Sequence, residues 1–144
     1  MTKEEVLSRF AKGLDCSQVV LMHFADELGY DEEELGRIAS AFGGGMFRGD
    51  TCGCVTGALM ALGMKYGHGG PDEWEQKETI VKKGAAYMAA FAERYGSLYC
   101  RELTGYDFSV PGELEKARAS GVMLERCPLY ALAAMEEAGK LLED

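Results

Sequence analysis

Residues 43–65 read GGGMFRGDTCGCVTGALMALGMK, a glycine-rich loop followed by two cysteines and a run of small and apolar residues. The apolar residues after the cysteines occupy most sides of a helix, which is the pattern of a helix buried all round. Its glycines, Gly53, Gly57 and Gly63, would let a neighbouring helix or a ligand approach the backbone closely. The stretch therefore predicts a central buried helix over residues 51–65, entered through a glycine-rich loop.

The rest of the chain also has helical periodicity. Thr2 and Glu5 form a capping box, in which each side chain bonds the other's backbone N–H. Pro128 stands near the start of the last helix, where proline is favoured. No sustained alternation or hairpin turn marks a strand. We expect an all-α fold, one domain spanning residues 1–144, with about six helices near residues 2–12, 16–28, 32–42, 51–65, 72–95 and 127–142 and a short amphipathic segment at 111–119.

The composition limits the classes of protein that the chain can represent. Its 144 residues suffice for one domain with its own core. A net charge of −9 argues against nucleic acid, which needs a basic surface, and against anionic membranes. The N-terminus lacks the features of a secretory signal, and no stretch is long and apolar enough to cross a bilayer. We therefore expect a cytoplasmic protein without membrane insertion, in a compartment that keeps its five cysteines reduced.

The glycine-rich loop differs from a phosphate-binding P-loop at the decisive position. Residues 44–51 follow the spacing G-x-x-x-x-G-D-T, so that Asp50 stands where the motif requires lysine. A carboxylate there would repel phosphate, which disfavours a nucleotide site. Backbone N–H groups in such a loop can instead be directed at a thiolate or at the sulfur of a cluster.

The cysteines share a local setting at helix starts. Cys16 follows Asp15, a predicted N-cap, Cys52 follows another capping pair, and Cys127 is itself a predicted N-cap. The N-terminus of a helix lowers the pKa of a thiol and favours the reactive thiolate. For Cys100, the sequence shows less clearly what would stabilise a thiolate. Redox chemistry, metal binding or both are indicated, because core packing alone does not place cysteines at helix ends.

The spacings alone do not identify the kind of site. There is no C-x-x-C, and the pattern matches neither a zinc knuckle, a thioredoxin motif nor a ferredoxin. Cys52 and Cys54 form a C-x-C pair whose side chains would point to different sides of a regular helix, although both could serve the site if the first turn is irregular. His23 is a candidate ligand or proton donor near Cys16, although a half-buried, hydrogen-bonded histidine is the commoner role.

The residues from Cys52 to Gly63 resemble the signature of the C_GCAxxG_C_C family of redox-active proteins. One cysteine precedes the signature and two follow it, so the resemblance implies a set of four: Cys16, Cys52, Cys100 and Cys127. Cys54 stands at the signature's alanine position and is an extra thiol. The family is also similar to the cysteine-bearing region of split-Soret cytochromes, for which an iron–sulfur cluster is proposed.

The resemblance implies electron transfer or redox sensing through an iron–sulfur cluster, with [2Fe–2S] as the expected type. The expected ligands are Cys16, Cys52, Cys100 and Cys127, with Gly53 and Gly57 against the cofactor and Cys54 as an extra ligand or resolving thiol. The alternatives are a metal-free thiol–disulfide protein, a structural Cys₄ zinc site, or a helical interaction module with inert cysteines. An electron donor or acceptor protein is the expected partner, and self-association remains open.

Overall fold

The computed structural model describes residues 1–143, so Asp144, the last residue of the predicted domain, lies outside the described part. Within that part the chain is all-α, as predicted, and forms no β-strand. The ten α-helices are α1 (Lys3–Ala11), α2 (Cys16–His23), α3 (Ala25–Leu28), α4 (Glu32–Ala39), α5 (Gly53–Tyr66), α6 (Trp74–Tyr95), α7 (Cys100–Thr104), α8 (Glu113–Ser120), α9 (Val122–Glu125) and α10 (Cys127–Leu142).

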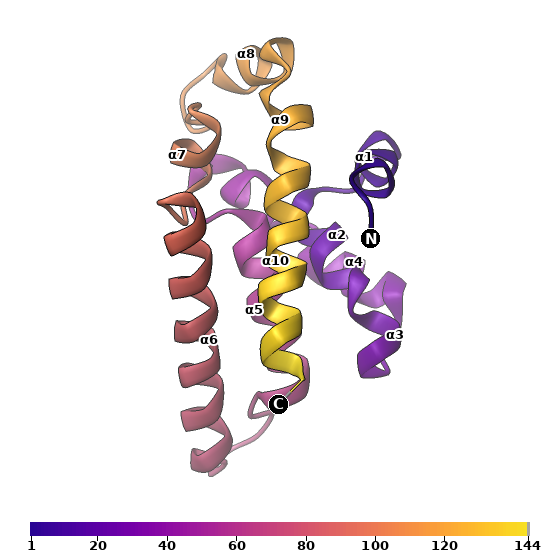
Figure 1. Cartoon of the computed structure of the whole chain (residues 1–144), viewed down its shortest axis with the longest axis vertical. Coiled ribbons are helices and arrows are strands. Elements are labelled where there is room, and N and C mark those ends of the chain that lie inside the picture. The colour runs from indigo at the N-terminus through magenta and orange to yellow at the C-terminus, as the bar shows by residue number, and fades with distance from the viewer. Residues whose placement is uncertain (144) are drawn as a thin grey trace.

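The helix α5 is the central element, as the sequence predicts. It packs against α2, α6 and α10. The long helices α6 and α10 run side by side, while α1 to α4 lie on the other side of α10 and α7 to α9 form one end of the molecule (Figure 1). All four cysteine-bearing helices start towards the end at which α7 lies, so the fold directs several helix N-termini to one region.

The expected number of about six helices is wrong, because several short helices add to it. The helix expected over residues 16–28 is broken at Phe24, whose buried ring takes part in the core while its backbone leaves the helical region (φ −94°, ψ 1°). The helices α3, α7 and α9 have only four or five residues each. A helix of this length spans little more than one turn, so no apolar repeat can mark it in the sequence.

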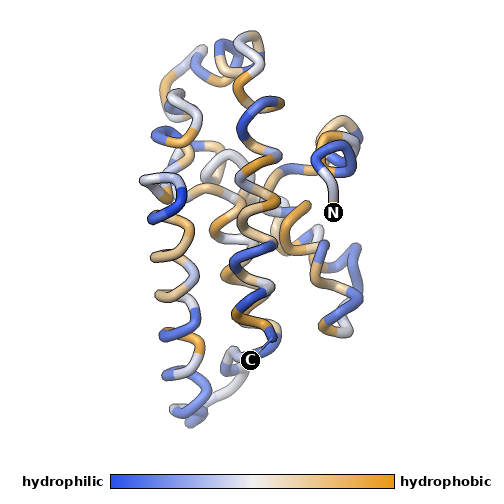
Figure 2. The backbone as a smooth tube through the Cα atoms, viewed as in Figure 1, coloured by the Kyte–Doolittle hydropathy of each residue, from blue (hydrophilic) through white to orange (hydrophobic). Residues whose placement is uncertain are grey.

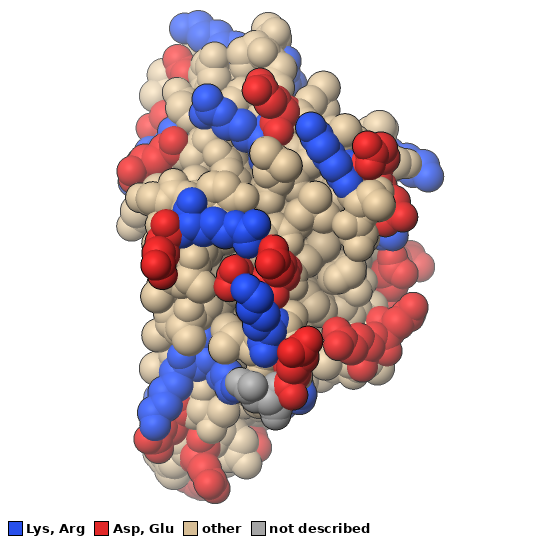
Figure 3. Space-filling model, viewed as in Figure 1, with Lys and Arg blue, Asp and Glu red and all other residues tan. Residues whose placement is uncertain are grey.

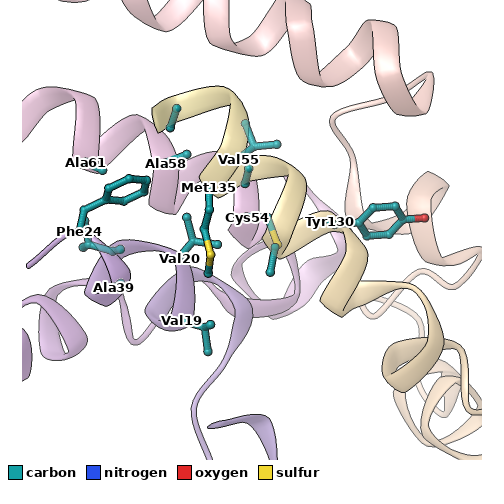
Figure 4. Close-up of a cluster of buried hydrophobic side chains, with 14 of the residues drawn as sticks. Val19, Val20, Phe24, Ala39, Cys54, Val55, Ala58, Ala61, Tyr130 and Met135 are labelled. Atoms are coloured by element: carbon teal, nitrogen blue, oxygen red, sulfur yellow. The ribbon is translucent and has the colours of Figure 1, made fainter. Parts of the chain in front are cut away.

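The core lies between α2, α5 and α10. Hydrophobic residues concentrate on the central helices, and the outer turns of the peripheral helices are hydrophilic (Figure 2). In Figure 4, Cys54 lies beside Met135 and Val20 in this core. Tyr130 extends away from the cluster, towards the end of the molecule where α7 lies. The core therefore reaches up to the cysteines without a break.

The contact between α2 and α5 depends on a glycine. A Cβ atom on Gly57 would lie 2.7 Å from the carbonyl oxygen of Ser17, which is closer than real Cβ atoms come to other atoms. Ser17 cannot easily move, because it is fully buried and its hydroxyl donates a hydrogen bond to the carbonyl oxygen of Ala39 at 2.8 Å. Gly57 thus lets the starts of α2 and α5 approach closely.

Replacing Gly57 with alanine is expected to lower the free energy of unfolding by about 1–3 kcal/mol, the usual cost of overpacking a core. Gly63→Ala is the matched control in the same helix, because a Cβ there would meet nothing within 4 Å. This control should stabilise the helix by up to about 1 kcal/mol. Urea unfolding of both variants measures the difference, and equal effects would contradict the close approach of α2 to α5.

One region of the surface carries mainly acidic side chains. On the face shown in Figure 3, acidic side chains gather at the edge where α3 and α4 lie, and α4 begins with three glutamates, Glu32, Glu33 and Glu34. Over α10, charges of both signs form ion pairs, such as that between Arg94 and Glu136 at 3.0 Å. None of the helices within residues 1–143 has the length and apolar character needed to traverse a bilayer.

Candidate functional site

All five cysteines line one cavity of about 350 Å³. Cys16, Cys100 and Cys127 are the first residues of α2, α7 and α10, and Cys52 is the N-cap of α5. Cys54, the second residue of α5, lines the same cavity. The structure therefore brings together the four cysteines expected as ligands, each from the start of a different helix.

A short antiparallel pairing holds Cys52 beside Cys100. Thr51 and Tyr99 form an isolated β-bridge. The backbone N–H of Cys52 donates to the carbonyl oxygen of Leu98 at 2.8 Å, and that of Cys100 donates to Asp50 at 2.7 Å. These two bonds join segments almost fifty residues apart in the chain, and they set the spacing of two cysteines directly.

Contacts between α7 and α10 relate Cys100 to Cys127. The Tyr130 hydroxyl donates to the carbonyl oxygen of Leu103 at 2.7 Å, and the Arg126 guanidinium donates to the same oxygen at 3.3 Å. Cys127 therefore begins α10 directly beside the end of α7. The expectation that Cys127 is an N-cap is wrong by one position, since Arg126 is the N-cap.

The glycine-rich loop forms a left-handed turn against Cys16. Four successive residues, Gly44, Gly45, Met46 and Phe47, have φ values of 58°, 64°, 58° and 55°. For a non-glycine residue this region costs roughly 1–2 kcal/mol. The N–H groups of Gly44 and Ser17 donate hydrogen bonds to the Cys16 sulfur. The loop thus supplies one backbone donor to this sulfur atom, from Gly44, and the first turn of α2 supplies the other, from Ser17.

Cys16 is the centre of a hydrogen-bonded group of three thiols. Hydrogen bonds from Cys52 and Cys54 hold the pKa of Cys16 well below its ordinary value, and the backbone N–H groups add to this effect against the opposing effect of burial. The same hydrogen bonds to Cys16 raise the pKa of Cys52 and of Cys54. Both thiols of the C-x-C pair therefore reach Cys16, because Cys52 is the N-cap and lies outside the regular helix that begins at Gly53.

Loss of hydration is the main influence on the pKa of the remaining two thiols, Cys100 and Cys127. It raises the pKa of Cys100 to about 12 and that of Cys127 to about 12, and the charge of Cys16 adds to both shifts. The lowered thiol pKa expected from helix termini is thus found at Cys16 and is wrong for Cys52 and Cys127. The hydrogen bond to Cys16 is the main cause at Cys52, and loss of hydration is the main cause at Cys127.

The reduced, metal-free protein is expected to be alkylated first at Cys16. Because its pKa lies well below that of an ordinary thiol, Cys16 loses its proton at a lower pH than the other cysteines, whereas the pKa of Cys100 and that of Cys127 are raised to about 12. Cys16 is also only partly buried, whereas Cys52, Cys54 and Cys100 are buried; Cys127 is as accessible as Cys16 and differs from it in pKa. Iodoacetamide labelling at several pH values, followed by peptide mass mapping, gives the order of reaction. Equal labelling of all five cysteines would contradict this electrostatic arrangement.

The sequence did not indicate the other walls of the cavity. They carry mainly apolar and aromatic side chains, with Asp15 and Arg118 as the charged members; the apolar ones are Phe10, Leu14, Phe108, Met123, Leu124 and Tyr130. Most come from α1 and from residues 106–125, where the apolar pattern is weak. Within residues 106–125, only the amphipathic pattern of residues 111–119 indicated a buried face.

Three other residues considered in the sequence lie outside the lining of the cavity. A Cβ on Gly53 would lie 2.5 Å from the Cys16 sulfur, so this glycine makes room for Cys16, and Gly57 makes room for Ser17. His23 lies at the opposite end of α2 from Cys16 and packs edge-on against Phe24, with ring centroids 4.8 Å apart. His23 therefore has no contact with the cavity in this structure.

The cysteines surround the cavity without converging on a single point. Within residues 1–143, no three Cys, His, Asp or Glu side chains are arranged to hold one metal ion. The five cysteines are free thiols. The arrangement is one of several sulfur donors spread around a shared space, with backbone N–H groups at one of them.

Comparison with protein families finds one match. The model of a family described as "Putative redox-active protein (C_GCAxxG_C_C)" matches residues 14–141, nearly the whole chain. The matched region contains all five cysteines, the glycine-rich loop and the glycines between α2 and α5. No curated protein and no solved structure is significantly similar to the chain.

Proposed function

This chain belongs to the C_GCAxxG_C_C family of redox-active proteins, and we propose that it transfers or senses electrons through an iron–sulfur cluster. The proposed ligands are Cys16, Cys52, Cys100 and Cys127. The observation that carries the proposal is that these four residues, each at the start of a different helix, line one cavity. A bound cluster would supply reversible uptake and release of one electron.

The donor set fits an iron–sulfur cluster. Four cysteine thiolates are the usual ligands of a [2Fe–2S] cluster, and hydrogen bonds to sulfur tune its potential. The N–H groups of Gly44 and Ser17 already donate to the sulfur of Cys16. Sulfur donors spread around a cavity suit a cofactor of several atoms better than a single zinc ion, whose four ligands meet at one point.

The buried thiols would release protons when the cluster binds. Ligation requires thiolates, while Cys52, Cys100 and Cys127 all have raised pKa values in the metal-free protein. Cluster binding is therefore expected to weaken as the pH falls, because protons compete for the ligands.

We propose a reducing compartment such as the cytoplasm, and a protein partner that donates or accepts the electron.

The proposal is tested by spectroscopy on anaerobically purified protein. The preparation should be brown, and its visible absorption should bleach on addition of dithionite and return on reoxidation. A colourless preparation, or colour that does not respond to reductant, would contradict the proposal. If the cysteines bind only zinc, metal analysis should give about one zinc ion per chain, and the visible absorption should not change on addition of dithionite.

A thiol–disulfide function is the second candidate, and one observation favours it. The sulfur of Cys16 accepts hydrogen bonds from both Cys52 and Cys54, so Cys16 has two candidate partners for a disulfide. A peroxide could oxidise two of these thiols to a disulfide, taking up two electrons and two protons to form water and an alcohol or a second water. Mass mapping after mild oxidation of the metal-free protein should then reveal one defined, reducible pair that includes Cys16.

A further inference from the structure

We propose that the outer part of the cysteine cavity binds a small organic anion, with an apolar body and one carboxylate that pairs with Arg118. Binding by Arg118 and the apolar walls requires no cofactor. The role of such an anion as the substrate or electron acceptor of the cysteine site rests on the proposed function.

The cavity runs from the buried cysteines to the protein surface. Cys52 and Cys54 are 5% and 1% exposed, whereas Leu124, which lines the same cavity, is 61% exposed. Arg118 also lines it and is exposed. A molecule entering from solvent would therefore pass Arg118 and Leu124 before it reaches the sulfur atoms.

The walls between these two ends are suited to an apolar body. Phe10, Phe108 and Met123 are partly buried and line the cavity together with Leu14 and Tyr130. The whole cavity, including the part lined by the cysteines, has a volume of about 350 Å³, which lies at the lower end of the range of small-molecule sites, about 300–1,000 Å³. Sites of this kind combine mostly apolar walls with a few polar groups that fix the orientation of the ligand.

Arg118 is the basic residue of the lining, and its charge is available to a ligand. Within residues 1–143 its guanidinium makes no hydrogen bond and no ion pair. Burial raises the pKa of the Asp15 carboxyl in the same lining, and the charge of Arg118 acts on that carboxyl in the opposite direction. Asp15 is the acidic residue of the lining, but its side chain packs against Gly43, where an added Cβ would lie 2.5 Å from the Asp15 Cβ. Guanidinium groups bind carboxylates in a bidentate manner. A carboxylate is therefore the polar group that this cavity would recognise.

Calorimetric titration of the anaerobically purified protein tests the proposal with three probes: 4-phenylbutyrate, the neutral 4-phenylbutan-1-ol and the cationic 4-phenylbutylamine. We expect 4-phenylbutyrate to bind, and the amine to bind at least tenfold more weakly. Arg118→Glu should weaken binding of 4-phenylbutyrate at least tenfold. The control is Lys116→Glu, which makes the same change in charge at another exposed residue of α8 and should alter the affinity by less than twofold. Leu124→Glu should weaken binding as well, and Leu129→Glu, at an exposed leucine outside the lining, should not.

Absence of 4-phenylbutyrate binding at millimolar concentration would overturn the proposal. Equal effects of Arg118→Glu and Lys116→Glu would also overturn it, because the attraction would then come from general charge. Iron is measured in every sample. A sample without iron that still binds 4-phenylbutyrate through Arg118 contradicts the proposed function and supports the anion site, and a sample with iron that does not bind contradicts the anion site alone.

Discussion

Replacing Cys16 with serine is expected to abolish cluster binding. Cys16 is one of the four proposed ligands, and its sulfur also receives the hydrogen bonds of Cys52, Cys54, Gly44 and Ser17. A serine hydroxyl is a poor substitute for a thiolate as a ligand of an iron–sulfur cluster. Iron content and visible absorption after anaerobic purification measure the effect, and both should fall to background.

Cys54→Ser is the matched control for this change. Cys54 is as well placed in the cavity as the others but stands at the alanine position of the family signature, so it is not one of the four proposed ligands. We expect this variant to retain the iron content of the wild-type protein. If instead Cys54→Ser removes the iron and Cys16→Ser keeps it, the assignment of the ligands is wrong.

Replacing Gly53 with alanine is expected to remove most of the bound iron and to destabilise the protein by about 1–3 kcal/mol. The new Cβ would lie 2.5 Å from the Cys16 sulfur, and 3.0 Å from both the Phe42 carbonyl oxygen and the Ser17 nitrogen. Two of these three neighbours are backbone atoms, so the Cys16 sulfur would have to move out of its position in the cavity. Iron content and urea unfolding measure the two effects.

Gly57→Ala separates the effect on the site from the effect on stability. It also crowds the contact between α2 and α5, but its Cβ would meet the backbone of Ser17 and not the sulfur. We expect a similar loss of stability with a smaller loss of iron. Equal loss of iron in both variants would show that the packing of the helices, and not the position of Cys16, controls cluster binding.

The fold class and the central helix could be predicted because they depend on long apolar patterns. The helix α5 is apolar on most sides and is buried as expected, and the 22-residue helix α6 shows its repeat clearly. The break at Phe24 could not be predicted, because the apolar pattern continues through it into α3. The break coincides with a phenylalanine ring that is buried in the core, and burial of this kind is not visible in the local sequence.

The cysteines of the site could be predicted, but its electrostatics could not. Helix starts pointed to Cys16, Cys52 and Cys127, the family resemblance added Cys100, and the structure places all of them around one cavity. The pKa of Cys100 and of Cys127 is raised to about 12 because both thiols lose hydration, and that loss depends on residues distant in sequence. The contribution of Arg118 and Leu124 to the cavity was missed because the apolar pattern of residues 106–125 is weak, although Leu124 stands only three residues before Cys127.

The most direct test of the central claim is the measurement of iron and acid-labile sulfide per chain in anaerobically purified protein. The wild-type protein is compared with a variant in which Cys16, Cys52, Cys100 and Cys127 are all replaced by serine. For a [2Fe–2S] cluster we expect about two iron atoms and two sulfide ions per wild-type chain, and none in the variant. A wild-type protein free of iron and sulfide, or equal amounts in both proteins, would contradict the claim that these four cysteines hold an iron–sulfur cluster.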